Sequence, residues 1–255
     1  MKKLTTIILS LLFSLQLIGC SSKGDTIPIP YRLGNIISYD VSNSALEYLQ
    51  SSDTVTVTDD KYITFTPKEN MHDTGFIFYP GGLVEAEAYA PIMNKIAQQG
   101  YLTIVVPMPM NLAVLGSGKA KDVIKDYPNI KNWVIGGHSL GGVMACKFAA
   151  KNPETIKGVV LYASYPQNDE LKDTDIRVLS IWGSEDKVAD INKVFDAKYK
   201  VNSDDAEFIE IVGGNHGHFG DYGEQKGDGE SIITPQEQWD EASQYTVAFL
   251  ESFND

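Results

Sequence analysis

The feature that most constrains the fold is an apolar stretch that ends in Gly-x-Ser-x-Gly and continues into small residues. Residues 133–136 read Trp-Val-Ile-Gly, and residues 137–141 read Gly-His-Ser-Leu-Gly. The apolar stretch is typical of a buried strand, whereas Gly141, Ala145 and Phe148 recur at helical spacing. A chain that passes from strand to helix at one residue holds that residue in strained geometry and exposes its side chain. The sequence therefore predicts a strand–turn–helix unit that presents the hydroxyl of Ser139.

Apolar strands alternate with amphipathic helices along most of the chain. Helical spacing is clearest where Tyr89, Ile92 and Ile96 fall on one face before Gly100. Such alternation predicts an α/β fold with a mostly parallel sheet and helices on both faces. The strands expected in this sheet are residues 75–79, 101–106, 133–138, 158–162, 178–182 and 208–212.

Other elements are expected at the two ends of this region. Residues 54–58 and 62–65 alternate as an antiparallel edge pair with a tight turn at Asp59 and Asp60, and residues 43–49 indicate a short helix. The last helix should begin at Thr234, because Glu237 three residues later completes a capping box.

The first residues have the pattern of an exported protein. Lys2 and Lys3 precede an apolar stretch from residue 4 to 18 that is too short to span a bilayer. The sequence Leu-Ile-Gly-Cys at 17–20 resembles the bacterial lipobox, which implies cleavage before Cys20 and a lipid on that cysteine. An ordinary cleaved signal with a chance cysteine is the alternative. We expect export, with a lipid anchor at the extracytoplasmic face of a bacterial membrane.

Length and charge limit the remaining possibilities. We expect a signal peptide at residues 1–19, a flexible tether at 20–30 and one catalytic domain at 31–255. The formal net charge of the chain is −13, and loss of Lys2 and Lys3 makes the mature chain more acidic. A chain this acidic is repelled by nucleic acid and by anionic lipid. Any membrane association should therefore come from the lipid anchor on Cys20.

An activated serine needs a histidine and an acid, and both should follow strands of the same sheet. The carboxyl ends of parallel strands share one edge, so we look after residues 182 and 212. Asp186 is the expected acid, with Glu185 as the nearest rival and Asp190 behind it. His216 is the expected base because two glycines precede it, and His218 is the alternative. The non-catalytic alternatives are that Asp186 only caps the following helix and that the loop histidine only makes a structural hydrogen bond.

Oxyanion donors and substrate contacts are expected at the same edge of the sheet. The backbone N–H of Leu140, at the start of a helix, would bind an oxyanion formed over Ser139. A second donor is expected after the strand at 75–79, with Gly82 as our choice and Leu83 as the alternative. Glu85 and His138 are candidate substrate contacts, although Glu85 and Glu87 also suit the solvated start of a helix, and a side chain inside the turn often only packs there.

The chain order Ser139, Asp186, His216 is that of the α/β-hydrolase superfamily, which the sequence resembles over residues 54–253. More narrowly it resembles small, capless bacterial α/β-hydrolases, often lipoproteins, in the stretches 78–82, 137–142 and 214–223. The resemblance implies the fold and a Ser-Asp-His triad. Residues 163–176 are too few for the usual helical cap, whereas the loop at 217–233 is long enough to fold over the site.

These residues predict a serine hydrolase that cleaves small acyl esters without a cofactor or metal. The same acyl-enzyme could transfer its acyl group to another alcohol, so an acyltransferase remains open. A metal hydrolase using His216, His218 and Asp221 is a further class, for which His-x-His is weak support. The last class is a binding lipoprotein with a retired site, which retention of the serine, acid and histidine disfavours.

We predict that Cys20 is the lipidated first residue of the mature protein. Intact mass of membrane-extracted protein should show a chain that begins at Cys20 and carries acyl groups. Cys20→Ala should release the protein from the membrane, whereas Cys146→Ala should leave it anchored. A mature chain that begins elsewhere, or an unmodified Cys20, would contradict the prediction.

Overall fold

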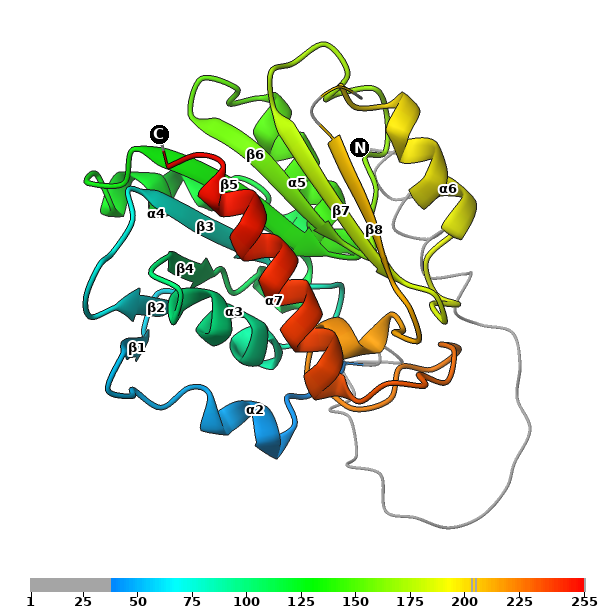
Figure 1. Ribbon diagram of the computed structural model, residues 1–255, viewed down its shortest axis with the longest axis horizontal. Coiled ribbons are helices and arrows are strands. Elements are labelled where there is room, and N and C mark those ends of the chain that lie inside the picture. The colour runs from blue at the N-terminus through cyan, green and yellow to red at the C-terminus, as the bar shows by residue number, and fades with distance from the viewer. Residues whose placement is uncertain (1–37, 203, 205, 255) are drawn as a thin grey trace.

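The computed structural model describes residues 38–254 except 203 and 205. The predicted signal peptide, Cys20 and the tether at 20–30 lie outside the described residues. Within the described part, one sheet of eight strands has the order β1-β2-β4-β3-β5-β6-β7-β8 (Figure 1). The strands are β1 Val55–Asp59, β2 Ile63–Pro67, β3 Thr74–Tyr79, β4 Leu102–Val105, β5 Asn132–His138, β6 Ile156–Tyr162, β7 Arg177–Gly183 and β8 Ala206–Ile211.

The sheet is antiparallel at one edge and parallel elsewhere. β1 pairs with β2 and β2 with β4 in the antiparallel sense, whereas the pairs from β4 through β8 are parallel. The expected fold class is therefore confirmed, including the antiparallel edge pair. The expected turn at Asp59 and Asp60 is displaced, because Asp59 still pairs with Ile63 and residues 60–62 make the connection.

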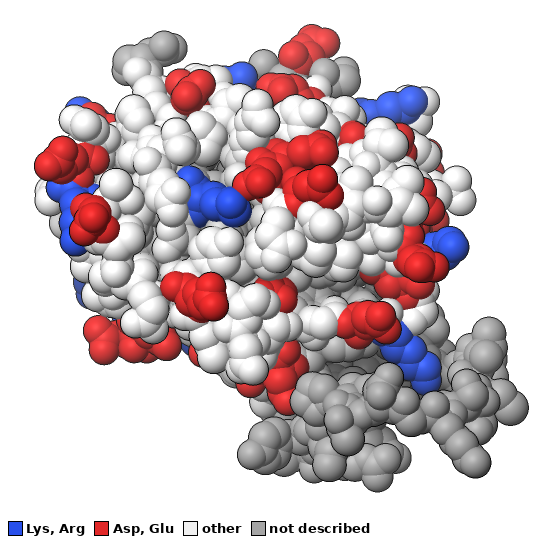
Figure 2. Space-filling view, turned by 60° about the horizontal axis from the view of Figure 1, so that its bottom comes forward, with Lys and Arg blue, Asp and Glu red and all other residues white. Residues whose placement is uncertain are grey.

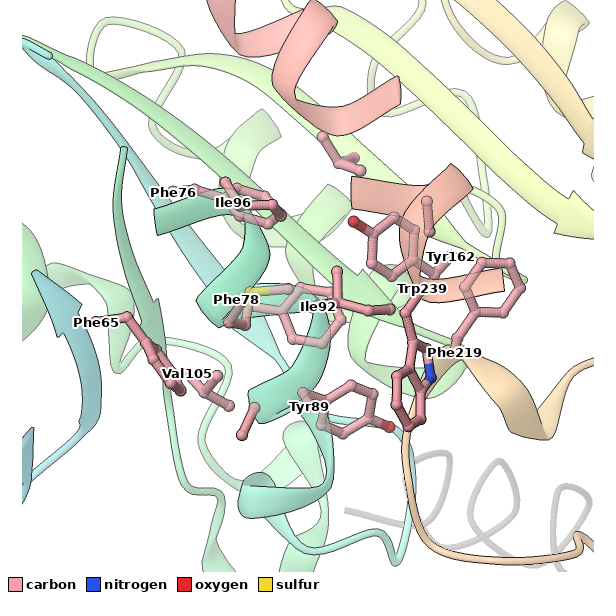
Figure 3. Close-up of a cluster of buried hydrophobic side chains, with 14 of the residues drawn as sticks. Phe65, Phe76, Phe78, Tyr89, Ile92, Ile96, Val105, Tyr162, Phe219 and Trp239 are labelled. Atoms are coloured by element: carbon pink, nitrogen blue, oxygen red, sulfur yellow. The ribbon is translucent and has the colours of Figure 1, made fainter. Parts of the chain in front are cut away.

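Helices cover both faces of the sheet, as the alternating pattern predicts (Figure 1). One face buries Phe76 and Phe78 under α3 and α7, with Trp239 in the same cluster (Figure 3). The other face buries Ile77 and Ile135 under α4 and α5. The helices are α2 Asn43–Glu47, η1 Ala86–Tyr89, α3 Ala90–Ala97, η2 Pro109–Asn111, η3 Ala113–Leu115, α4 Ala120–Asp126, α5 Leu140–Ala150, α6 Ile191–Asp196, η4 Ala197–Tyr199, η6 Gly217–Phe219 and α7 Pro235–Glu251.

Local sequence signals set two of the helix ends. The Thr234 hydroxyl accepts the N–H of Glu237 at 3.2 Å, and the Glu237 carboxylate accepts the N–H of Thr234 at 2.8 Å. These reciprocal bonds satisfy two amides that the first turn of α7 leaves unpaired. Gly100, at a φ of +93°, follows α3 in the left-handed conformation that glycine adopts without strain.

Two expectations about the region from β6 to β8 have different outcomes. The segment between β6 and β7 contains no helix, so the absence of a cap there is confirmed. The last strand was expected to include Val212, but β8 ends at Ile211, opposite Gly183 of β7. Val212 is 70 % exposed, and Gly213 at a φ of +85° turns the chain, because the neighbouring strand offers no further pairing.

In the described part of the chain, every helix is too short or too polar to cross a lipid bilayer.

Candidate active site

The turn between β5 and α5 holds Ser139 in strained backbone geometry. Ser139 has φ 50° and ψ −120°, its N–H donates to the Tyr162 carbonyl at 2.9 Å, and its own carbonyl accepts the Ser164 hydroxyl at 2.7 Å. A Cβ at Gly141 would lie 2.4 Å from the Pro80 carbonyl oxygen, and one at Gly137 would lie 2.5 Å from the Gly141 carbonyl carbon. Only glycine fits at either place. These contacts compress the turn and hold the strain at Ser139.

The structure brings Asp186 and His216 into contact. His216 Nδ1 lies 2.8 Å from Asp186 Oδ2, and the His216 side chain is 1 % exposed. The other carboxylate oxygen of Asp186 accepts the N–H groups of Val188 and Ala189, each at 2.8 Å. These bonds orient the carboxylate, which in turn orients the imidazole. With Nδ1 held by Asp186, Nε2 is the nitrogen free to accept a proton; it is buried and unpaired within the described residues.

The loops that carry the acid and the histidine are joined to each other. The Glu185 N–H donates to the Gly214 carbonyl at 2.8 Å, and the Gly213 N–H donates to the Ser184 hydroxyl at 2.8 Å. Because β7 and β8 end side by side, these short loops meet directly. A shift of one loop would therefore move the other.

Gln238 of α7 holds the residue next to His216. Its side-chain oxygen accepts the Asn215 N–H at 3.0 Å, and its amide group donates to the Asn215 carbonyl at 2.8 Å. The Asn215 side chain donates to the Gly229 carbonyl and accepts the His218 N–H. Sequence analysis missed Gln238. A polar residue at a buried position of an amphipathic helix was the available signal, since buried amides need partners.

The rival residues have other partners. Glu185 accepts the Ser184 hydroxyl at 3.1 Å, and Asp190 forms an ion pair with Lys193 at 3.4 Å. His218 is half-buried, and its Nδ1 is unpaired within residues 38–254, leaving aside 203 and 205. Of the candidate acids and histidines, it is Asp186 and His216 that meet.

Gly82 and Leu140 also lie together, whereas Leu83 is engaged elsewhere. A Cβ at Gly82 would lie 3.2 Å from the Leu140 side chain, so the two residues are in contact. Leu140 begins α5, where the first N–H groups have no partner inside the helix. The Leu83 N–H instead donates to the Asn111 carbonyl at 2.7 Å. Of the two candidate donors, Leu83 therefore has its N–H engaged by a backbone carbonyl.

Glu85 and His138, the candidate substrate contacts, both have partners within the protein. A Glu85 carboxylate oxygen accepts the Val41 N–H at 2.8 Å, so the carboxylate fastens the N-terminal segment. His138 is 1 % exposed, and its ring lies 4.5 Å from the ring of His216. Tyr89 closes its other side, with a hydroxyl 2.9 Å from His138 Nδ1.

Residues 38–44 form a strap across two loops of the site, which sequence analysis also missed. Tyr39 donates its N–H to Leu83 at 2.7 Å and accepts the N–H of Glu85 at 3.2 Å. Further along, the Ser42 N–H donates to the Asp221 carbonyl at 2.8 Å. The strap therefore joins the loop that carries Gly82 to the loop that follows His216. Its residues before α2 lack the periodicity that marks a strand or helix.

The loop at 217–233 packs closely against the body of the protein. Phe219 and Tyr222 are buried, and the Asp228 carboxylate accepts the Gly217 N–H at 2.7 Å. The Asp221 N–H donates to the Ala88 carbonyl at 2.7 Å. The loop thus contributes to the enclosure of His216.

Comparison with known proteins agrees with this architecture. The model of a family described as the alpha/beta hydrolase family matches residues 75–240. The chain belongs to this family. No curated protein sequence matches the chain.

Solved structures share the fold at low sequence identity. A predicted CIB-like hydrolase from Thermoplasma acidophilum is 16% identical, with a TM-score of 0.57 over 78% of this chain and 99% of its own. The esterase domain of a Rhodothermus marinus protein is 11% identical, with a TM-score of 0.59 over 76% of this chain and 93% of its own. Carboxyl esterase 2 from Tuber melanosporum is 11% identical, with a TM-score of 0.61 over 88% of this chain and 94% of its own. At these identities the likeness concerns the fold.

The residues considered as metal ligands in this α/β-hydrolase are not arranged for a metal. His216 Nδ1 is bonded to Asp186, and the Asp221 carboxylate accepts the Ser44 hydroxyl at 2.5 Å. Across the described residues, no three His, Cys, Asp or Glu side chains are grouped so that they could hold a metal ion.

Burial determines the charge of two histidines near the site. Burial, and then the positive charge that His216 can carry, lower the pKa of His138 well below its ordinary 6.5, while the His216 backbone opposes them. Burial also lowers the pKa of His218, against the pull of Asp228, Asp221 and Glu224. Both side chains therefore favour the neutral form in the folded protein.

We predict that the α/β-hydrolase loses stability as the pH falls below 6.5. The unfolded chain then binds protons at His138 and His218 that the folded protein excludes, so protonation favours unfolding until the lowered pKa values are reached. The free energy of unfolding in urea should be lower at about pH 5.5 than at about pH 7.5 in the wild type. The decrease should be smaller in His138→Gln. Equal decreases in the two proteins would contradict the prediction.

Proposed function

We propose that this α/β-hydrolase is a serine carboxylesterase that uses Ser139, His216 and Asp186. The observation that carries the proposal is the buried His216–Asp186 pair beside a strained serine turn. His216 is held at Nδ1, and its unpaired Nε2 suits the role of general base. His138 Nε2 and His218 Nδ1 are also buried and unpaired within the described residues, so the contact between His216 Nδ1 and Asp186 is what distinguishes His216 from the other two.

The reaction follows from these roles. Ser139 Oγ attacks the acyl carbon while its proton passes to His216 Nε2, and Asp186 stabilises the imidazolium. The N–H groups of Gly82 and Leu140 bind the oxyanion. The proton on Nε2 then passes to the leaving alcohol, which departs as the C–O bond breaks and the acyl-enzyme forms. Water, deprotonated by His216, releases the acid and restores Ser139.

Short and medium acyl esters suit this site best. The segment between β6 and β7 carries no helix that could cap Ser139 from that side. Two of the solved structures with this fold are named as esterases. Asp and Glu side chains are spread over the face shown in Figure 2 with fewer basic ones, which disfavours polyanionic substrates.

We also propose that the enzyme acts outside the cytoplasm, anchored through lipid on Cys20. The support is the sequence of residues 1–20 alone, in which a basic start and an apolar stretch precede Leu-Ile-Gly-Cys. The acidic composition of the chain offers no electrostatic attraction to an anionic membrane.

Ser139→Ala should reduce hydrolysis of p-nitrophenyl butyrate roughly 10⁴-fold or more while leaving urea unfolding near that of the wild type. Ser180→Ala is the matched control, because Ser180 is buried in β7 and its hydroxyl is unpaired within the described residues. A fluorophosphonate should label the wild type and the control but not Ser139→Ala. Undiminished turnover by Ser139→Ala, or loss of activity with EDTA in place of fluorophosphonate, would overturn the serine mechanism.

His216→Ala should lower turnover by several orders of magnitude, whereas His218→Ala should lower it far less. Removal of His216 takes away the proton acceptor, while His218 does not contact Asp186. Steady-state kinetics of both variants decides between them. The reverse order of damage would contradict the assignment of His216.

A further inference from the structure

Tyr89 contacts both halves of the site. It ends η1, is 0 % exposed, and packs its ring against Phe78 at a centroid distance of 4.9 Å (Figure 3). Its hydroxyl lies 2.8 Å from the backbone nitrogen of Gly81 and 2.9 Å from His138 Nδ1. Gly81 belongs to the loop that offers an oxyanion donor, and His138 immediately precedes Ser139.

We propose that Tyr89 is a positioning residue, whose hydroxyl sets the Gly82 N–H and the His216 ring relative to Ser139. The inference rests on the proposed esterase function and adds to it a residue that touches neither substrate nor the reacting atoms. Tyr89 acts through Gly81 on one side and through His138 on the other.

The first arm concerns the oxyanion loop. The Gly81 N–H is bonded to the Tyr89 hydroxyl, and the Leu83 N–H is bonded to the Asn111 carbonyl. Gly82 lies between these two fixed peptides, and its N–H makes no hydrogen bond within the described residues. The flanking bonds therefore determine where this free N–H points. Since an oxyanion donor acts only at the correct distance and angle, rotation of the Gly81 peptide would weaken it.

The Gly81 backbone is also confined by these side chains. A Cβ at Gly81 would lie 2.8 Å from the Tyr89 hydroxyl and 2.8 Å from His138 Nδ1. The loop therefore packs directly on the Tyr89–His138 pair. Without the Tyr89 hydroxyl, this packing loses the hydrogen bond from the Gly81 N–H.

The second arm concerns the histidines. The Tyr89 oxygen accepts the Gly81 N–H, so its single proton goes to His138 Nδ1, and a neutral His138 then carries its own proton on Nε2. The His138 ring lies against the His216 ring, with the ring centroids 4.5 Å apart and an angle of 49° between the ring planes. His216 is thus held by Asp186 at Nδ1 and by His138 across its face. A neutral neighbour does not repel the imidazolium that forms when Ser139 attacks, and the lowered pKa of His138 fits this arrangement.

The other groups around His138 are uncharged rings. Phe219 and Tyr222 lie 5.9 and 6.5 Å away by ring centroids, and burial raises the pKa of the Tyr222 hydroxyl. Burial likewise raises the pKa of Tyr89, so its hydroxyl keeps the proton that it donates. The contact between Tyr89 and His138 is therefore a hydrogen bond between two groups that burial keeps uncharged.

Tyr79 provides a matched control for the loss of a buried hydroxyl. It is also 0 % exposed, and its hydroxyl accepts the Ala120 N–H at 3.1 Å and donates to the Ser117 carbonyl at 2.9 Å. Its side chain lies in the core on the opposite face of the sheet from Tyr89. Tyr79→Phe and Tyr89→Phe each remove one buried hydroxyl that has two hydrogen-bond partners. Of these two hydroxyls, it is the one of Tyr89 that contacts Gly81 and His138.

The test compares Tyr89→Phe and Tyr79→Phe by kcat and KM for p-nitrophenyl butyrate, the rate of fluorophosphonate labelling, and urea unfolding. Both variants should lose comparable stability, because each leaves buried polar groups unpaired. Tyr89→Phe should lower kcat and the labelling rate about tenfold to a hundredfold, as small misplacements of catalytic groups do, with KM changed about twofold or less. Tyr79→Phe should keep kcat and the labelling rate within about twofold of the wild type.

The outcomes separate this inference from the proposed function. If the wild type is labelled and the two variants have the same kcat, the role of Tyr89 is overturned and the esterase proposal stands. If the wild type is not labelled, both fall. Should Tyr89→Phe fail to fold, His138→Asn and His138→Leu replace it, because the asparagine amide keeps a polar atom near the position of Nδ1. His138→Asn should then retain at least about tenfold more kcat than His138→Leu, and equal values would overturn the inference.

Discussion

The close contact between the serine turn and the loop after β3 is the constraint on which the site depends. Gly141 leaves no room for a Cβ against the Pro80 carbonyl, and Gly137 leaves none against Gly141. This packing keeps Ser139 in its strained conformation and, through the same contact, brings Gly82 against Leu140. The nucleophile and the pair of N–H groups proposed to bind the oxyanion are therefore positioned by one set of backbone contacts rather than by separate ones.

Around this contact, buried polar groups connect the loops that carry the proposed chemistry. Gln238 holds Asn215, Ser184 holds Gly213, and the strap at 38–44 joins Leu83 to Asp221. Each bond satisfies a backbone group that burial would otherwise leave unpaired, which is costly in a protein interior. The loops are thus held by the same requirement that stabilises the fold. Such preorganisation suits a site that has no cap domain to close over the substrate.

The parts of the fold that followed from the sequence are those with a short-range signal. The turn around Ser139, the capping box at Thr234 and Glu237, and the alternation of apolar strands with helices depend on neighbouring residues and on burial. The end of β8 at Ile211 could not be derived in this way. It depends on where β7 stops, and Val212 is as apolar as the residues before it.

For the candidate site, the sequence by itself determined the residue types, their order along the chain and their place at the carboxyl ends of strands. This information predicted Ser139, Asp186 and His216 at one edge of a parallel sheet, with Glu185, Asp190 and His218 as open alternatives. Only the tertiary structure decided which of neighbouring candidates meet. Asp186 and not Glu185 reaches His216, and Leu83 is taken by Asn111. Tyr89, Gln238 and the strap at 38–44 became visible only there, because hydrogen bonds between residues distant in sequence leave no periodic pattern in the chain.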